Sequence, residues 1–301
     1  MKTHSSTADS NETASSGAAS HVTLVARTAR MLQLRSGIAA GGAKPGFLAR
    51  RIRSELASHG RHRYADLLRR AEQDEPGAFQ ALRNLLTIKY SRFWREPAHW
   101  PILGEHLRLK FLADAPVRLW SAACARGEEA YSMAMVAAEV QASLPGLECD
   151  WRVLASDVDT DALASTASAT YSRSSLGDLP ARLRARYLVE QSGRSEPAWQ
   201  VTEALRDRVD RLHFDLTRPE WPALPGAPFD VIFLSNALIY FDRTVQARVL
   251  GNAAACLRPD GILLTGRSEG RLTHAAPWLK ACGDCAYIPA AAPPPPTSSP
   301  R

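Results

Sequence analysis

The chain is 301 residues long and 45% hydrophobic, which is sufficient for two domains with a sizeable core. Its formal net charge of +6 implies attraction to an acidic partner, and nucleic acid, an anionic membrane or an acidic protein surface would each satisfy that. No apolar run reaches membrane-spanning length, so no membrane insertion is expected.

The cysteines indicate the compartment. Five of them are scattered along the chain, which does not suggest a disulfide framework and favours a reducing cytoplasm. Cys282 and Cys285 have C-x-x-C spacing, but no second pair and no histidine cluster completes a zinc site. We therefore expect ordinary residues beside a terminal strand, and no metal.

The first 90 residues divide into a polar start and a helical region. Residues 1–20 are rich in Ser, Thr, Ala and Asn and are expected to be disordered. Residues 22–90 show helical periodicity, with amphipathic segments at 47–56, 64–71 and 78–86. These segments predict a small helical N-terminal domain.

Three arginines lie on one face of the first amphipathic segment: Arg50, Arg51 and Arg53. A solvated helix surface explains such a face, and a docking surface for an acidic partner explains it equally well. The residues alone leave both interpretations open.

The next segment, LTIKYSRFWREPAHWP at 86–101, places Arg95 among aromatic residues. An arginine cannot lose its charge, so it is either well solvated or bound to an anionic partner. An exposed linker with aromatics in an inter-domain seam is the alternative interpretation. Residues 91–115 are expected to be a linker that contributes to the functional site.

From about residue 116 strands and helices alternate. Strands are predicted at 117–120, 151–155, 229–234, 261–265 and 285–288, and helices at 128–140, 161–167 and 244–257. This order is typical of an α/β fold with a mainly parallel sheet and right-handed crossovers, extending over residues 116–290.

Two segments depart from that rhythm. Residues 187–214 are expected to form a small antiparallel β insertion, with short strands at 199–201 and 209–214. The tail 291–301 contains a run of prolines and is expected to be extended and disordered.

Ligands bind beyond the carboxyl ends of the strands in an open parallel sheet. The first strand is followed by small residues and then by Glu128 and Glu129 at a helix start. Two acids there disfavour a pyrophosphate and favour a cationic ligand group, although they also suit the first turn of any helix. The second strand ends at Asp157, which is well placed to accept hydrogen bonds from ribose hydroxyls.

Two further segments complete the predicted site. Asp215 with Leu216 suits the amino group and face of an adenine ring, and Ser235 with Asn236 ends the third strand one turn before Tyr240. A helix cap with core aromatics is the alternative for the latter segment. A nucleoside with a positive centre, an acidic ribose acceptor and no phosphate loop together indicate S-adenosylmethionine, whose methyl transfer is an in-line displacement.

Taken together, these segments resemble the CheR-type chemotaxis receptor methyltransferases over roughly residues 35–290. Motifs similar to those of the family are T-x-N-x-T-x-F-F-R-E at 87–96, W-S-A-A-x-x-x-G-E-E-x-Y-S at 120–132, A-S-D-x-D at 155–159, N-x-x-I-Y-F-D at 236–242 and L-x-P-x-G-x-L at 257–263. Several motifs in one order make the resemblance specific.

The resemblance implies a class I S-adenosylmethionine-dependent methyltransferase with an all-α N-terminal domain, which methylates receptor glutamates and releases S-adenosylhomocysteine. It implies a set of cofactor-site residues: Lys89, Ser91, Arg95, Glu128, Asp157, Asp215, Leu216, Ser235 and Asn236. Arg95 and Tyr240 would be nearest the reacting methyl group. The arginines at 50, 51 and 53 would face the cytoplasmic helices of a receptor.

The resemblance also implies that the β insertion corresponds to a subdomain that binds a receptor C-terminal peptide in some members. A monomer is expected. Several residues depart from the family pattern: Lys89 replaces Asn, Ser91 replaces Thr, Ser235 replaces Arg, Asp215 replaces Asn and Arg267 replaces His. We therefore keep a catalytically impaired module that binds S-adenosylmethionine or S-adenosylhomocysteine as an alternative function.

A methyltransferase for another substrate is a further alternative. Nucleic acid is suggested only by the positive charge, and a base-flipping N-P-P-Y-like motif is absent after the third strand, so nucleic acid is not an expected partner. A nicotinamide dehydrogenase is disfavoured because the first loop lacks G-x-G-x-x-G.

Overall fold

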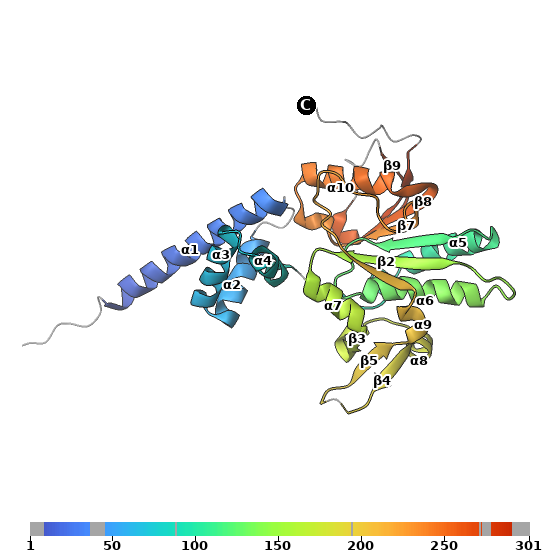
Figure 1. The fold of residues 1–301 in the computed structure, drawn as a ribbon, viewed down its shortest axis with the longest axis horizontal. Coiled ribbons are helices and arrows are strands. Elements are labelled where there is room, and N and C mark those ends of the chain that lie inside the picture. Colours follow the sequence, from blue (N-terminus) through green and yellow to red (C-terminus); the bar gives the residue numbers. More distant parts are fainter. Residues whose placement is uncertain are drawn as a thin grey trace, which may run out of the picture. The chain divides into compact units, whose positions relative to one another are not determined.

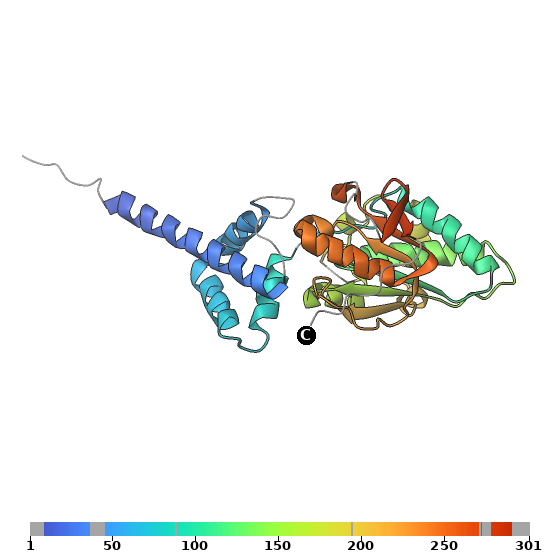
Figure 2. The ribbon, with the colours of Figure 1, turned by 90° about the horizontal axis from the view of Figure 1, so that it is seen from above.

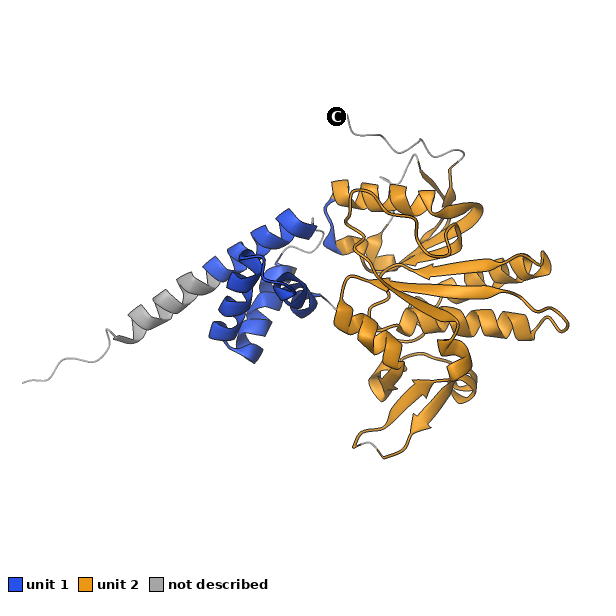
Figure 3. Ribbon diagram, in the orientation of Figure 1, with its two compact units in different colours: residues 1–87, 240–242 blue, residues 88–239, 243–301 orange. Residues whose placement is uncertain are grey.

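A computed structural model describes residues 9–36, 46–87, 89–193, 195–270, 272 and 278–290. They belong to two compact units, residues 1–87 with 240–242 and residues 88–239 with 243–301 (Figure 3). Among the helices in these ranges, none is both long and apolar enough to cross a membrane.

The first unit is all helical. Its helices are α1 (Asp9–Ser36), α2 (Phe47–His59), α3 (Arg61–Glu72) and α4 (Ala78–Leu86), shown in Figure 1. Apolar faces meet in one core in which Ile52, Leu68 and Leu82 have no exposed surface. The three predicted amphipathic segments are therefore helices α2, α3 and α4, packed together through their apolar stripes.

The N-terminal segment differs from the expectation of disorder over residues 1–20. Residues 9–20 belong to α1, and residues 1–8 lie outside the described residues. Residues 9–20 contain no proline, and a helix extends at low cost from a turn that is already formed. That formed part is the second half of α1, which buries Leu24, Met31 and Leu32. The tail 291–301, also expected to be disordered, lies outside the described residues.

The second unit is built on a seven-stranded sheet. Its strands are β1 (Val117–Ser121), β2 (Trp151–Asp157), β6 (Val209–His213), β7 (Phe229–Leu234), β8 (Leu257–Thr265), β9 (Leu279–Gly283) and β10 (Ala286–Pro289). The spatial order is β6-β2-β1-β7-β8-β10-β9. Neighbours from β6 to β8 are parallel, and β10 runs antiparallel to both β8 and β9. The mainly parallel sheet is thus confirmed.

Helices cover both faces of this sheet. They are α5 (His99–Leu112), α6 (Glu128–Ala142), α7 (Thr160–Ser168) and α10 (Arg243–Ala255). The chain moves from β1 towards one edge and from β7 towards the other, so right-handed crossovers place α6 and α10 on opposite faces (Figures 1 and 2). The smaller elements are η1 (Arg173–Ser175), α8 (Ala181–Tyr187), α9 (Glu203–Arg206), η2 (Leu238–Tyr240) and η3 (Arg267–Glu269).

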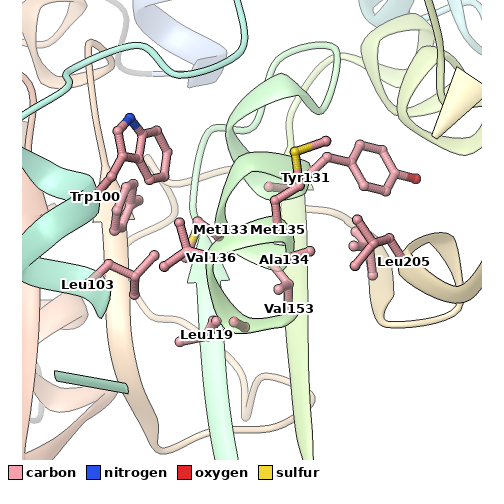
Figure 4. Packing of buried hydrophobic residues seen from close by; sticks show 14 of the residues in the cluster. Trp100, Leu103, Leu119, Tyr131, Met133, Ala134, Met135, Val136, Val153 and Leu205 are labelled. Carbon is pink, nitrogen blue, oxygen red and sulfur yellow. The ribbon is translucent and has the colours of Figure 1, made fainter. Parts of the chain in front are cut away.

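Helix α6 is the centre of the core. Figure 4 shows its Met133, Met135 and Val136 among side chains from β1, β2, α5 and α9. Ser132 and the apolar residues from Ala130 to Met135 have no exposed surface. Because the helix is enclosed on nearly every side, the residues at its first turn are held rigidly relative to the sheet.

Helix α5 corrects the expectation of a linker over residues 91–115. Residues 99–112 form four turns that pack against α6, and Leu103, Leu107 and Phe111 have no exposed surface. The sequence has Leu103 and Leu107 four residues apart, which is helical spacing. Only residues 91–98 before α5 and 113–115 after it are non-helical.

The β insertion also differs from expectation. Its three-stranded antiparallel sheet has the order β3-β5-β4, from β3 (Thr170–Ser172), β5 (Ala198–Val201) and β4 (Leu188–Gln191). The strand predicted at 199–201 is confirmed as β5. The strand predicted at 209–214 is not part of the insertion, because β6 pairs in parallel with β2 at the edge of the main sheet. Alternating polarity is common to edge strands and hairpins, so the sequence did not distinguish them.

Candidate functional site

The carboxyl ends of β1, β2 and β7 lie together where the order of the main sheet reverses. Crossovers leave β1 in one direction and β7 in the other, so their following loops diverge and leave a place for a ligand. Ser121, Asp157 and Ser235 stand at these three ends. Asp157 and Ser235, two of the predicted site residues, therefore lie at the same edge of the main sheet.

The loop between β1 and α6 is clamped in one conformation. The backbone N–H of Cys124 donates to the oxygen of Ser156 at 2.9 Å, and the hydroxyl of Tyr171 donates to the oxygen of Arg126 at 2.8 Å. Gly127 has φ +95°, and a Cβ there would lie 2.8 Å from Thr166 and 2.9 Å from the Tyr171 hydroxyl. Only glycine fits this turn without strain.

Glu128 begins α6 and is fully buried. Burial raises the pKa of its carboxyl, and its own backbone N–H, the charge of Arg126 and the nearby hydroxyls of Ser175 and Ser91 partly offset that. None of these groups makes a hydrogen bond of ordinary geometry with the two carboxylate oxygens. A buried carboxylate without partners is costly, and a cationic group of a ligand would relieve that cost.

Glu129 was predicted with Glu128 to favour a cationic ligand group but was not included among the cofactor-site residues. Its Oε1 accepts a hydrogen bond from the Ser121 hydroxyl at 2.7 Å. Burial raises the pKa of its carboxyl to about 7, while the Ser121 and Ser235 hydroxyls and the Arg95 charge lower it. The pair Glu128–Glu129 therefore adds two pKa-shifted acids to the start of one helix.

Asp157 ends β2 and is held by the backbone. Its Oδ2 accepts from the N–H of Ala125 at 2.8 Å and its Oδ1 from the N–H of Asp159 at 2.9 Å. Burial nevertheless raises the pKa of the carboxyl to about 6. The acceptor predicted for ribose hydroxyls is thus fixed in direction.

The segment after β6 lies next to Asp157. The N–H of Phe214 donates to the backbone oxygen of Asp157 at 3.0 Å, which brings Asp215 and Leu216 to the same strand end. Leu216 is buried, and Oδ1 of Asp215 accepts from the backbone and hydroxyl of Thr217 at 2.9 and 2.6 Å. Asp215 and Leu216 thus lie at the strand end that carries Asp157, and their contact with an adenine ring stays a prediction.

The segment that carries Arg95 is anchored to the second unit through its neighbours. Phe93 is fully buried against Tyr171, with ring centroids 4.9 Å apart, and its N–H donates to the oxygen of Ser175 at 2.8 Å. The N–H of Trp94 donates to the Ser132 hydroxyl at 3.1 Å. These two aromatics therefore fix the backbone directly before the arginine.

Arg95 and Asn236 meet directly. Nη2 of Arg95 donates to Oδ1 of Asn236 at 2.7 Å, and the guanidinium lies over the Tyr90 ring, 5.9 Å from its centroid. These two predicted site residues, 141 positions apart, share one hydrogen bond at the end of β7.

Lys89 is directed to the start of α7. Its Nζ lies 3.2 Å from Oδ2 of Asp159 and 3.0 Å from Oδ2 of Asp161. Ser235 instead lies beside Glu129. The lysine at this position is thus matched in charge by two acids at the start of α7.

The remaining predicted residues fall in the first unit. Tyr240 groups with residues 1–87, so a shared site with Arg95 stays a prediction. On α2, Arg50 and Arg53 are exposed, whereas Arg51 donates to the oxygen of Leu85 at 2.9 Å and pairs with Glu55 at 2.8 Å. Arg51 therefore has a structural role in joining α2 to α4.

The residues present fit one kind of ligand. A partnerless buried carboxylate suits an ammonium group, a backbone-held aspartate suits vicinal hydroxyls, and no glycine-rich phosphate loop follows β1. Within the described ranges no cluster of three or more His, Cys, Asp or Glu side chains is arranged to hold a metal ion. A mainly parallel sheet with this set of acids fits the class of S-adenosylmethionine-dependent methyltransferases.

The chain belongs to the CheR methyltransferase family. The family model for the "CheR methyltransferase, SAM binding domain" matches residues 89–287, and that for the "CheR methyltransferase, all-alpha domain" matches residues 25–87. Both family domains are therefore present.

Curated relatives agree with this family. The chemotaxis protein methyltransferases of Escherichia coli (strain K12) and Salmonella typhimurium are each 34% identical over 244 residues, covering 81% of this chain and 82% of the relative. Chemotaxis protein methyltransferase 2 of Pseudomonas aeruginosa is 34% identical over 216 residues, covering 72% of this chain and 75% of the relative.

Proposed function

We propose that this protein transfers the methyl group of S-adenosylmethionine to glutamate side chains of methyl-accepting chemotaxis receptors, forming glutamate methyl esters. The observation that carries the proposal is the hydrogen bond between Arg95 and Asn236, 2.7 Å long, at the strand ends where Glu128 and Asp157 also lie. It supports a carboxylate-binding cation beside a cofactor site. The names of the relatives support the receptor as substrate.

The chain's residues have separable tasks in this reaction. Glu128 holds the ammonium group of the cofactor, Asp157 its ribose hydroxyls, and Asp215 with Leu216 its adenine. The cofactor, when bound, supplies an electrophilic methyl group on a sulfonium. Arg95 orients the substrate carboxylate, which is already a nucleophile and needs no general base.

Other site residues act nearby. Lys89, Ser91 and Ser235 line the cofactor site, and Tyr240 orients the reacting groups by hydrogen bonding. The Lys89 substitution, which motivates the alternative of an impaired binding module, is matched in charge by Asp159 and Asp161 and supports an intact site.

The partner is the cytoplasmic helical domain of a receptor. The exposed Arg50 and Arg53 of α2 attract the acidic helices that carry the methylated glutamates. The β3-β5-β4 sheet is the place where a receptor C-terminal peptide would bind. Such a substrate places the protein in the cytoplasm, and we propose that it acts there as a monomer.

The test is methyl transfer to receptor membranes from the same organism, with a labelled methyl group on the cofactor. We expect base-labile label that mass spectrometry maps to receptor glutamates. Arg95→Ala should lower the transfer rate at least 100-fold, whereas Arg92→Ala, three residues away and paired with Asp178, should retain it. Calorimetric binding of S-adenosylhomocysteine without label on any receptor would overturn the proposal in favour of the binding module.

A further inference from the structure

Glu96 follows Arg95 and turns its side chain back into the site. Its backbone has φ +55°, a left-handed conformation, and its oxygen accepts from the N–H of His99 in the first turn of α5 at 2.9 Å. The side-chain Oε1 accepts from Nδ2 of Asn236 at 3.4 Å and from the N–H of Arg267 at 3.3 Å. One carboxylate thus joins three segments distant in sequence.

The chain of hydrogen bonds has a fixed polarity. A carboxamide has one accepting and one donating end, a carboxylate only accepts and a guanidinium only donates. Since Glu96 accepts from the amide nitrogen of Asn236, the amide oxygen is left to accept from Arg95. A reversed amide would present its NH2 group to the guanidinium and lose both bonds.

The Asn236 side chain has little space around it, so its main freedom is which end of the amide faces Arg95. Asn236 has φ +61°, also left-handed for a residue other than glycine. A Cβ on Gly266 would lie 2.5 Å from Nδ2 of Asn236 and 2.7 Å from Oε2 of Glu269. The amide is therefore closely confined, and its polar partners determine which end faces Arg95.

Arg95 depends on that amide for its position. Its other hydrogen bond in the described part of the chain, from Nη1 to the oxygen of Tyr90, is 3.5 Å long. This bond is longer than the 2.7 Å bond from Arg95 to Asn236, so it is the weaker of the two. The short contact to Asn236 is therefore what holds the guanidinium in place.

We propose that Glu96 is a positioning residue for methyl transfer, which fixes the Asn236 amide and through it the Arg95 guanidinium. This inference rests on the proposed function. Glu129 also places an acid near Arg95, which partly balances its charge. A guanidinium balanced in this way orients a substrate carboxylate without binding it so strongly that its attack is slowed.

The kinetic test compares Glu96→Ala, Glu96→Gln and, as a control, Glu105→Gln on the exposed face of α5. We expect Glu96→Ala to lower kcat for receptor methylation about 10- to 100-fold, with a smaller change in KM for S-adenosylmethionine. Glu96→Gln offers the same accepting oxygen and should return kcat to within about threefold of wild type. An unchanged kcat in Glu96→Ala, or an equal loss in Glu96→Gln, would overturn the proposal.

A second measurement does not need methyl transfer. The 15N spectrum of the Arg95 guanidinium, assigned by its loss in Arg95→Lys, reports rotation of the Nη groups. We expect slow rotation in wild type and Glu96→Gln and fast rotation in Glu96→Ala. If wild type methylated no receptor, the proposed function would fail while this spectrum still tested Glu96. Equal rotation in wild type and Glu96→Ala would refute the positioning role.

Discussion

At the residue scale, the buried carboxyl of Glu129 lowers the stability of the folded protein when it is ionised. Its pKa is raised from 4.5 to about 7 in the folded state, mainly by burial. Between those values the folded protein binds more protons than the unfolded chain, so the free energy of unfolding falls as pH rises through that window. Asp157, with its pKa raised to about 6, and Glu269, raised to about 7, act in the same direction.

Replacing Glu129 by Gln should therefore stabilise the protein without bound cofactor at pH 8 by about 2 kcal/mol, and by much less at pH 5.5. Urea unfolding at a series of pH values measures this, and Glu105→Gln on the exposed face of α5 is the control. An identical pH slope in wild type and Glu129→Gln would show that the raised pKa does not govern stability.

At the element scale, the loop between β1 and α6 depends on one glycine. Gly127→Ala puts a side chain on a left-handed backbone and places its Cβ 2.8 Å from Thr166. Gly146→Ala adds only the backbone strain, because no other atom lies within 4 Å of its added Cβ. We expect Gly146→Ala to cost about 1 kcal/mol and Gly127→Ala about 1–3 kcal/mol more. Equal losses on thermal unfolding would mean that the loop relaxes around the added methyl group.

Helices and strands with a clear local pattern of apolar residues were predictable from the sequence. Strands whose position depends on the strand they pair with were not. The strands β1, β2 and β7 followed from short apolar runs, and these runs also located the strand ends at which Asp157 and Asn236 were predicted as site residues. The position of β6 depends on its register with β2, which no local pattern contains.

The same distinction holds within the site. Glu128 and Glu129 look alike in the sequence, yet Glu128 is fully buried without partners and Glu129 accepts from Ser121. Glu96 reads as an ordinary acid beside Arg95, because its partners Asn236 and Arg267 are far away along the chain. Long-range contacts, rather than residue type, determine these roles.

At the scale of the whole molecule, charge and chemistry are divided between the two units. The acids expected to bind the cofactor lie in the second unit, whereas the exposed Arg50 and Arg53 lie in the first. The net charge of +6 favours association with an acidic receptor, and screening by salt weakens attraction between exposed charges. Substrate binding and cofactor binding should therefore respond differently to ionic strength.

Reversing both charges of α2, in Arg50→Glu with Arg53→Glu, should raise the KM for receptor about 10-fold at low salt and leave the affinity for S-adenosylhomocysteine unchanged. The matched control reverses Arg61 and Arg63, which are exposed on α3 of the same unit and change the net charge equally. If α2 is the docking face, only the α2 variant loses most of its salt dependence. If the α2 and α3 variants lost the same share of the salt dependence, the attraction would come from the net charge of the protein. Screening acts on the total charge, whichever helix carries it.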